Sequence, residues 1–251
     1  MAIQKSTGIL LARKDLRETS LILTIYTQGF GKIKGIVRGV RGPRGQYGGG
    51  SLEIFAYDEI VFYERRKSDL YTISQCDLID FFEPIREELA RLAYAAYMVE
   101  LLDSVTALAD PNKDVFRLLL NSLRLLSGSS SAKRVTRIFE IKLLALLGLM
   151  PSLDICANCS KALGANSRFS FGHGGLICGS CLKTDSNSRA IMPGTVKFIE
   201  HVRVVAFEKV ARIKVSREVG KELEELLRGF LDSHIERQLK SVKFLGEIER
   251  A

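Results

Sequence analysis

Residues 20–27 have the sequence Ser20-Leu-Ile-Leu-Thr-Ile-Tyr-Thr27, and they indicate the fold of the N-terminal part of the chain. Leu21, Leu23 and Ile25 fall on one face of an extended segment, the period-two pattern of a β-strand. Four more short segments rich in β-branched or aromatic residues, each bounded by glycine, aspartate or charged turns, lie near it: 8–12, 31–38, 54–63 and 71–80. The sequence therefore predicts five strands before residue 83.

Five short strands in so small a region suit a closed barrel, because closure leaves no strand edge exposed. We therefore expect a five-stranded OB-fold barrel over residues 1–82, with an SH3-like barrel as the alternative.

From residue 84 onward the apolar residues recur with the period of helices. One stripe contains Leu89, Leu92, Ala96, Val99 and Leu102, and a second contains Phe116, Leu119, Leu120, Leu123 and Leu126. Residues 132–149, 194–207 and 216–239 predict three further helices. The expected architecture is α+β and multidomain: the barrel, a helical domain made of residues 83–153 and 190–251, and an insertion at 154–189.

The insertion contains four of the five cysteines, as the pairs Cys156-Ala-Asn-Cys159 and Cys178-Gly-Ser-Cys181. Two such pairs can hold one ion with tetrahedral geometry, at metal–sulfur distances of about 2.3 Å. Thiolates favour Zn²⁺, with iron as the main competitor. Because four thiolates leave no open coordination position, we expect one structural Zn²⁺ per chain in a zinc ribbon.

A redox motif and a histidine ligand are the alternatives to a site of four cysteines, and both are disfavoured. A redox CxxC motif would ordinarily need one pair beside a βαβ unit, a pattern that this sequence lacks. His173 precedes Cys178 by five residues and is expected to be a turn residue rather than a ligand. Since the segment has few large apolar residues, metal binding must supply much of its folding free energy.

The net charge of +8 is unevenly distributed. Residues 1–50 contain nine Lys/Arg and two acids, whereas residues 51–100 contain five bases and eleven acids. A concentrated basic segment attracts polyanions, so nucleic acid is the expected partner. The alternative is a solvated surface whose charge keeps the protein in solution.

The predicted DNA-binding residues fall within thirteen positions that contain no acid: Lys32, Lys34, Arg38, Arg41 and Arg44. They lie in a strand and in the glycine-rich loop that follows it, where the backbone can approach phosphates closely. Such a cluster binds without sequence preference and with strong salt dependence. Phe30 and Tyr47 flank this basic run and are candidates either for stacking on bases or for packing in the barrel.

Several function classes lack their characteristic residues. The sequence has no P-loop, no HExxH motif and only three histidines, so we expect no enzymatic activity. No apolar stretch approaches the length that spans a bilayer, and the apolar run after Lys5 is too short for a signal peptide. The expected location is the cytoplasm. A metal-dependent nuclease or deaminase is disfavoured by the closed cysteine set.

The order of these parts resembles the bacterial recombination-mediator family RecO. Local strings add to the resemblance: Leu16-Arg-Glu-Thr-Ser-Leu21, Gly29-Phe-Gly-Lys32, Lys34-Gly-Ile-Val-Arg-Gly39 and the passage from Phe139 to Pro151. The second cysteine pair, preceded by Gly174-Gly175, is also similar to the family pattern. The loop at 39–50 departs from the family in its high glycine content.

The resemblance implies a non-enzymatic role in DNA repair and recombination. A RecO-like protein would bind ssDNA and dsDNA, anneal complementary strands, and act with RecR and SSB to promote RecA loading at the nucleoid. The resemblance also implies that the C-terminal tail of SSB docks on the helical domain, where Arg124, Lys133, Arg134 and Arg137 are the nearest basic cluster. The alternative function is a zinc-stabilised protein-interaction adaptor with incidental DNA affinity.

Overall fold

The structure, a computed structural model, describes residues 3–248 apart from 17, 41–50, 66–67, 129–130, 211–212, 214 and 236. The chain divides into two compact units, residues 1–136 with 239–251 and residues 137–238. No helix within the described residues is both long enough and apolar enough to cross a membrane.

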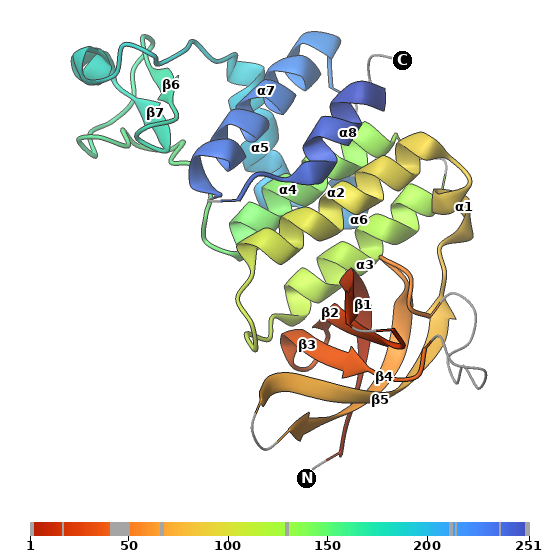
Figure 1. The fold of residues 1–251 in the computed structure, drawn as a ribbon. Coiled ribbons are helices and arrows are strands. Elements are labelled where there is room, and N and C mark those ends of the chain that lie inside the picture. The colour runs from red at the N-terminus through yellow and green to blue at the C-terminus, as the bar shows by residue number, and fades with distance from the viewer. Residues whose placement is uncertain are drawn as a thin grey trace. The chain divides into compact units, whose positions relative to one another are not determined.

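Five strands close into a barrel in the first unit (Figure 1). They are β1 (Ile3–Leu16), β2 (Ser20–Thr27), β3 (Gly31–Val37), β4 (Tyr57–Arg65) and β5 (Ser68–Asp80). The strand order around the barrel is β1-β2-β3-β5-β4, and β4 pairs with β1 to close it. β3 and β5 run parallel, whereas the other pairs are antiparallel. The predicted five-stranded OB-like barrel is confirmed.

β2 has the predicted bounds, β3 ends one residue early and β5 starts three residues early at Ser68, while β1 and β4 differ more. β1 runs well beyond the predicted 8–12 in both directions, because Lys5 pairs with Val61 on β4 and Lys14 pairs with Ile22 on β2. Charged residues at these positions break the apolar alternation on which the prediction depended. β4 begins later than the predicted residue 54, because Phe55 has a positive φ of 56° that interrupts the extended backbone.

Helices α1 (Glu83–Arg86), α2 (Leu89–Val105), α3 (Lys113–Ser127) and α8 (Lys240–Ile248) complete the first unit (Figure 1). α2 contacts the other three helices and β1, which explains why its residues are buried on most sides. α3 starts at Asn112, whose side chain accepts hydrogen bonds from the backbone N–H groups of Asp114 and Val115.

The C-terminal helix α8 returns to the first unit and is held at its N-terminus by α2. The Glu100 carboxylate accepts hydrogen bonds of 3.0 and 2.8 Å from the backbone N–H groups of Lys240 and Ser241. A carboxylate is favourable there because the first N–H groups of a helix lack intrahelical partners. The predicted single helix at 216–239 therefore ends at His234, and a separate helix follows.

The second unit contains most of α4 (Ala132–Leu146), the cysteine segment and three later helices. The cysteine segment forms a two-stranded sheet of β6 (Arg168–Ser170) and β7 (Gly175–Ile177), followed by the 3₁₀ helix η1 (Gly179–Thr184). The later helices are α5 (Pro193–Val204), α6 (Phe207–Val210) and α7 (Arg217–His234), and α5 packs against α7. The predicted helical region and its cysteine insertion are thus present, while the domain boundaries stay a prediction.

Candidate nucleic-acid interface and candidate metal centre

Strand β3 positions three of the five predicted DNA-binding residues. Lys32 and Lys34 lie on the outer face of the barrel, because Ile33 between them belongs to the buried core. Arg38 directly follows the last residue of β3. Arg41 and Arg44 lie outside the described residues.

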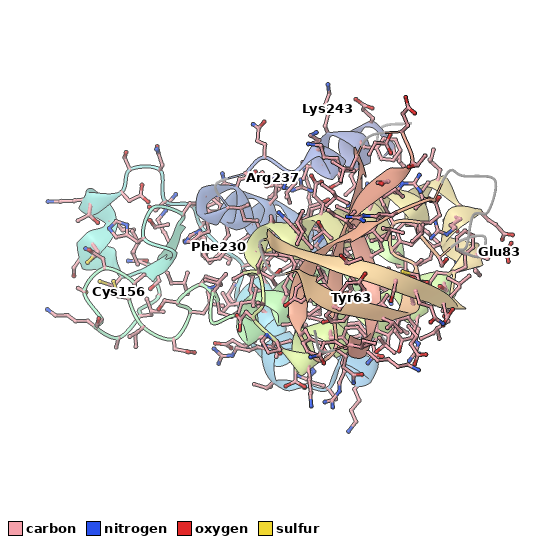
Figure 2. All side chains as sticks on the ribbon, turned by 60° about the horizontal axis from the view of Figure 1, so that its bottom comes forward. Tyr63, Glu83, Cys156, Phe230, Arg237 and Lys243 are labelled. Carbon is pink, nitrogen blue, oxygen red and sulfur yellow. The ribbon has the colours of Figure 1, made fainter. Side chains whose placement is uncertain are left out.

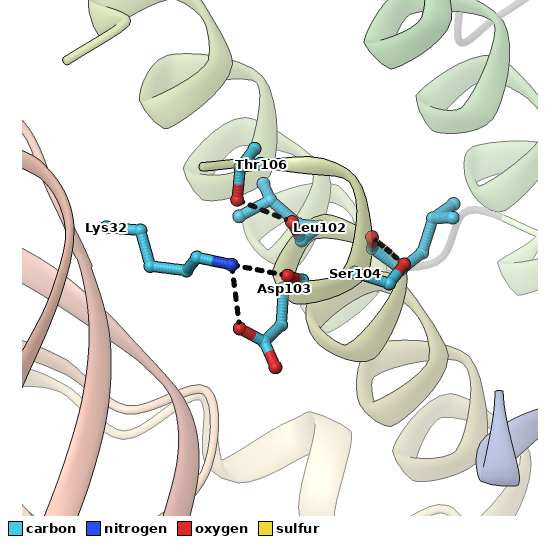
Figure 3. Close-up of polar contacts among 6 residues, drawn as sticks. Lys32, Leu102, Asp103, Ser104 and Thr106 are labelled. Carbon is cyan, nitrogen blue, oxygen red and sulfur yellow. Dashed lines mark hydrogen bonds and ion pairs between the residues drawn. The ribbon is translucent and has the colours of Figure 1, made fainter. Parts of the chain in front are cut away.

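Lys32 is buried in spite of its outward position. Its side chain is 9% exposed, and Nζ donates hydrogen bonds to the backbone carbonyl of Asp103 and, at 3.1 Å, to the Asp103 carboxylate (Figure 3). The Lys32 carbonyl in turn accepts a hydrogen bond from the N–H of Ala109. Asp103 lies in the last turn of α2, where the helix dipole favours a cation. The ammonium group of Lys32 is therefore paired within the protein, and it is not available to bind a phosphate.

Lys32 and Lys34 differ in burial although both point outward from the barrel. Ile9, Tyr26 and Lys32 form a row across β1, β2 and β3, and all three are buried. Lys34 is exposed two residues further along, where it pairs with Thr24. Arg38 is exposed as well. Lys34 and Arg38 are thus exposed to solvent, whereas Lys32 is buried.

Lys14 is an exposed cation on the same face that the sequence prediction did not include. It pairs with Ile22 on β2, and Lys34 pairs with Thr24 two residues away. Residues two apart on a strand share a face, so Lys14 and Lys34 lie on opposite sides of β2 on one surface. The charge of Lys14 was visible in the sequence, but only the length and register of β1 place it here.

The aromatic candidates have different outcomes. Phe30 packs edge-on against Phe62 with ring centroids 5.2 Å apart, which makes it part of the barrel's packing rather than a free stacking surface. Tyr47 lies outside the described residues.

The four predicted metal ligands lie together in the second unit. The sulfur atoms of Cys156, Cys159, Cys178 and Cys181 are all within 4.8 Å of one another, and those of Cys159 and Cys178 are 3.7 Å apart. A tetrahedron with metal–sulfur bonds of about 2.3 Å has sulfur atoms about 3.8 Å apart. The donor set and its spacing therefore fit a tetrahedral metal ion. Within the described residues, no other group of three or more potential ligands was found.

Backbone N–H groups near Cys156 favour its thiolate form. Burial raises the pKa of the Cys156 thiol, but hydrogen bonds from the backbone N–H groups of Cys178, Cys159 and Asn158 outweigh it and lower that pKa to about 6. The bond from Cys178 N–H to Cys156 Sγ measures 3.3 Å. Three of the cysteines are buried and Cys159 is partly exposed. Four thiolates would fill the coordination sphere, so the arrangement suits structural rather than catalytic metal binding.

His173 is not part of this cluster. Its Nδ1 lies 2.9 Å from Ser170 Oγ, and the same hydroxyl donates a hydrogen bond to the Asp185 carboxylate. The serine therefore stands between histidine and aspartate, whereas a catalytic triad places the histidine in the middle. Ser170 is also fully buried. The three side chains hold the β6–β7 turn against the segment after η1. His173 is therefore a turn residue, as predicted, but it is partly buried rather than exposed.

The comparison with protein families covers almost the whole chain. Residues 1–82 match the family "Recombination protein O N terminal", and residues 86–243 match "Recombination protein O C terminal". The chain belongs to the RecO family. The boundary between the two matches coincides with the end of the barrel and the start of the helices.

Curated RecO relatives align over nearly their full length. The "DNA repair protein RecO" of Pelotomaculum thermopropionicum is 34% identical, covering 100% of this chain and 96% of the relative. That of Syntrophus aciditrophicus is 33% identical, covering 99% and 97%. That of Moorella thermoacetica is also 33% identical, covering 97% and 91%. The chain is thus a RecO-family DNA repair protein with a cysteine cluster that could hold a metal ion.

Proposed function

We propose that this RecO-family protein binds single- and double-stranded DNA without sequence preference and anneals complementary strands. Its role is that of a mediator, not an enzyme: it acts with RecR and SSB at the nucleoid in the cytoplasm to promote RecA loading. The observation that supports DNA binding most directly is the exposed basic face of the barrel, formed by Lys14, Lys34 and Arg38. We call these three residues the barrel surface.

The barrel surface suits phosphates rather than base edges. Lys14 and Lys34 are on the strands on either side of β2, and Arg38 follows the end of β3. Arg41 and Arg44 extend the same basic run in sequence, so we include them in the proposed interface. Lys32 is left out, because its ammonium group already bonds to Asp103.

The salt dependence of binding tests this interface. Each phosphate contact contributes about −0.7 for single strands to −0.9 for duplex to the log–log salt slope. The double variant Lys34→Ala/Arg38→Ala should therefore weaken binding to all sequences alike and flatten the slope by about 1.4–1.8. Arg117→Ala is a matched control, because Arg117 is an exposed arginine already paired with Asp114 at 3.1 Å.

Two results would argue against the barrel surface. A Lys34→Ala/Arg38→Ala variant that bound DNA with the parental slope would exclude these residues as phosphate contacts. A parent protein that annealed no strands but still captured RecR would favour the alternative function of a protein-interaction adaptor.

We further propose that the cysteine cluster holds one structural Zn²⁺, bound by Cys156, Cys159, Cys178 and Cys181. The soft donor set and the sulfur spacing support it. The metal would supply the cross-link that this small ribbon lacks, since the ribbon's own buried cluster is little more than the cysteines and Ile177. Metal analysis of the purified protein should return about one zinc per chain.

The proposed partner SSB would dock through its acidic, apolar-ended tail in the second unit. A pocket of about 440 Å³ lies between α5 and the start of α7 and combines apolar side chains with two basic ones. Its lining is Gly194, Lys197, Phe198, His201, Ile213, Val215, Ser216 and Val219. In the basic cluster suggested by the sequence, Arg137 is buried in an ion pair with Glu140, which makes it a poor candidate. A tail peptide should bind the parent at low salt and lose affinity in Lys197→Ala.

A further inference from the structure

A ladder of rings joins the ribbon to α7, and both of its ends are exposed (Figure 2 labels Phe230 on α7 and Cys156 in the ribbon). Ring centroids are 5.2 Å apart for Phe171 and Phe169, 6.4 Å for Phe169 and Phe230, and 4.1 Å for Phe230 and His234. The guanidinium of Arg189 lies 5.0 Å from the centroid of Phe171. Phe169 and Phe230 are buried, whereas Arg189 and His234 are exposed.

The buried rings in the middle of the ladder account for the packing of the ribbon on α7. The exposed ends of the ladder, in contrast, are planar polar groups that could contact a ligand. Arg189 is a planar cation on a ring, and His234 is stacked on Phe230 at an interplanar angle of 25°. A planar group already stacked on one side offers its other side to a further ring. Unpaired bases are the rings that proteins bind in this way.

The ribbon side of the ladder is basic, whereas α7 contains five acids and three Lys/Arg. Residues 155–199 contain five Lys/Arg and a single acid, Asp185. The Asp185 carboxylate accepts hydrogen bonds from Ser170 and from the backbone N–H of Asn187, so it is engaged within the ribbon. Arg168 is held beside Arg189, because its guanidinium donates two hydrogen bonds, of 3.0 and 2.7 Å, to the carbonyl of Ser188. The charge on the ribbon side, where Arg168 and Arg189 lie, therefore favours a polyanion.

We infer that this second surface, formed by Arg168, Phe171, Arg189 and His234, binds a single nucleic-acid strand. We call it the ribbon surface. The inference rests on the proposed function, in which the barrel surface holds DNA and the protein anneals strands. Annealing brings two strands together, and a second surface lets one chain hold both. A duplex hides the faces of its bases, so the expected ligand is single-stranded.

Counting bound strands tests the ribbon surface. The full-length protein is titrated at low salt with a labelled oligothymidylate of about ten nucleotides, a length suited to a single site. The parent should bind two oligonucleotides per chain. Arg189→Ala should bind only one tightly, with the second weakened at least about fivefold, and Lys34→Ala/Arg38→Ala should also bind only one. Annealing rates should fall in both variants.

Arg217→Ala is the matched control, because Arg217 is an exposed arginine at the opposite end of α7 from His234, about 25 Å away along the helix. It should bind two oligonucleotides and keep the parental melting temperature. Arg189→Lys separates the contributions, since it keeps the charge and loses the planar group. Weakened binding of the second strand in Arg189→Lys supports stacking.

The outcomes distinguish the two proposals. If Arg189→Ala still binds two oligonucleotides with parental affinity, the proposal that the ribbon surface binds a strand is refuted. The proposal for the barrel surface is not affected by that result. If Lys34→Ala/Arg38→Ala binds both while Arg189→Ala loses one, the barrel surface is wrong and the ribbon surface stands. Binding of an acidic peptide in place of the oligonucleotide, with the same loss in Arg189→Ala, would overturn the assignment to nucleic acid.

Discussion

The ammonium group of Lys32 on β3 bonds to both the carbonyl and the carboxylate of Asp103 in the last turn of α2. The Lys32 side chain is 9% exposed and that of Asp103 18%, so this ion pair is largely sheltered from water. It connects the outer face of the barrel to the helices of the first unit. Lys32, although it belongs to the basic run at residues 32–44, therefore contributes to the packing between the barrel and α2.

Replacing Lys32 should therefore affect stability more than DNA binding. Lys32→Met keeps the bulk of the alkyl chain but leaves the sheltered Asp103 carboxylate without its cation, at a cost of about 2–4 kcal/mol. Urea unfolding measures this cost. Lys34→Met is the matched control and should change stability by less than about 0.5 kcal/mol, because Lys34 is exposed. Equal stabilities for the two variants would contradict the role of the ion pair.

Asp58 makes the stability of the barrel depend on pH. It is 4% exposed, and its Oδ1 has no hydrogen-bond partner among the described residues. Burial, followed by the charge of Asp77, raises its pKa to about 8. The folded state therefore binds a proton that the unfolded chain releases near pH 4, and stability falls as the pH rises from about 4 to 8. Asp58→Asn removes this titration.

The variant Asp58→Asn should be more stable than the parent by about 2–4 kcal/mol at pH 7 and equal to it near pH 4. Denaturant unfolding at several pH values measures the difference. Asp77→Asn removes only the smaller of the two causes of the raised Asp58 pKa, so it should stabilise the protein at pH 7 by much less than Asp58→Asn does. A gain for Asp58→Asn that was the same at pH 4 and pH 7 would refute the proposed titration.

Two glycines of α7 provide a matched pair for the packing of the ribbon. A Cβ at Gly229 would lie 2.8 Å from ring carbons of Phe171, whereas a Cβ at Gly220 would have its nearest neighbour, a Val215 methyl, at 3.8 Å. Gly229→Ala should destabilise the second unit by about 1–3 kcal/mol through overpacking. Gly220→Ala should stabilise it by up to about 1 kcal/mol, through helix propensity alone. Thermal unfolding of both variants measures the contrast, and similar melting temperatures would show that Phe171 does not pack there.

Loss of the metal should unfold the ribbon and loosen α7, because Phe169 on β6 packs against Phe230. Cys156→Ser, or treatment of the parent with a chelator, should therefore raise hydrogen exchange in residues 154–189 and in α7. The barrel has its own buried core and should exchange as before. Increased exchange confined to the ribbon would show that α7 is stable without it.

The sequence predicted the type of most elements, because hydrophobic periodicity is local. Residues 20–27 predict β2 with the bounds that the structure has, and the apolar stripe at Phe116–Leu126 predicts α3. The four candidate metal ligands could also be predicted from the sequence, since two CxxC pairs define a possible donor set by spacing alone. The ends of the strands were harder to predict from the sequence. β1 extends through charged residues that its neighbours pair with, and that pairing lies outside any local window.

Tertiary structure alone decided which basic residues face solvent. Lys32 and Lys34 have the same charge and lie on the same face of the same strand, so nothing in the sequence predicts that one is buried and the other exposed. The difference arises because the end of α2 and the connection to α3 cover Lys32, whereas the side chain of Lys34 reaches solvent, although its strand partner Thr24 is buried. Period-two patterning fixes the face to which a side chain points. What lies on that face depends on residues seventy positions away in the chain, such as Asp103.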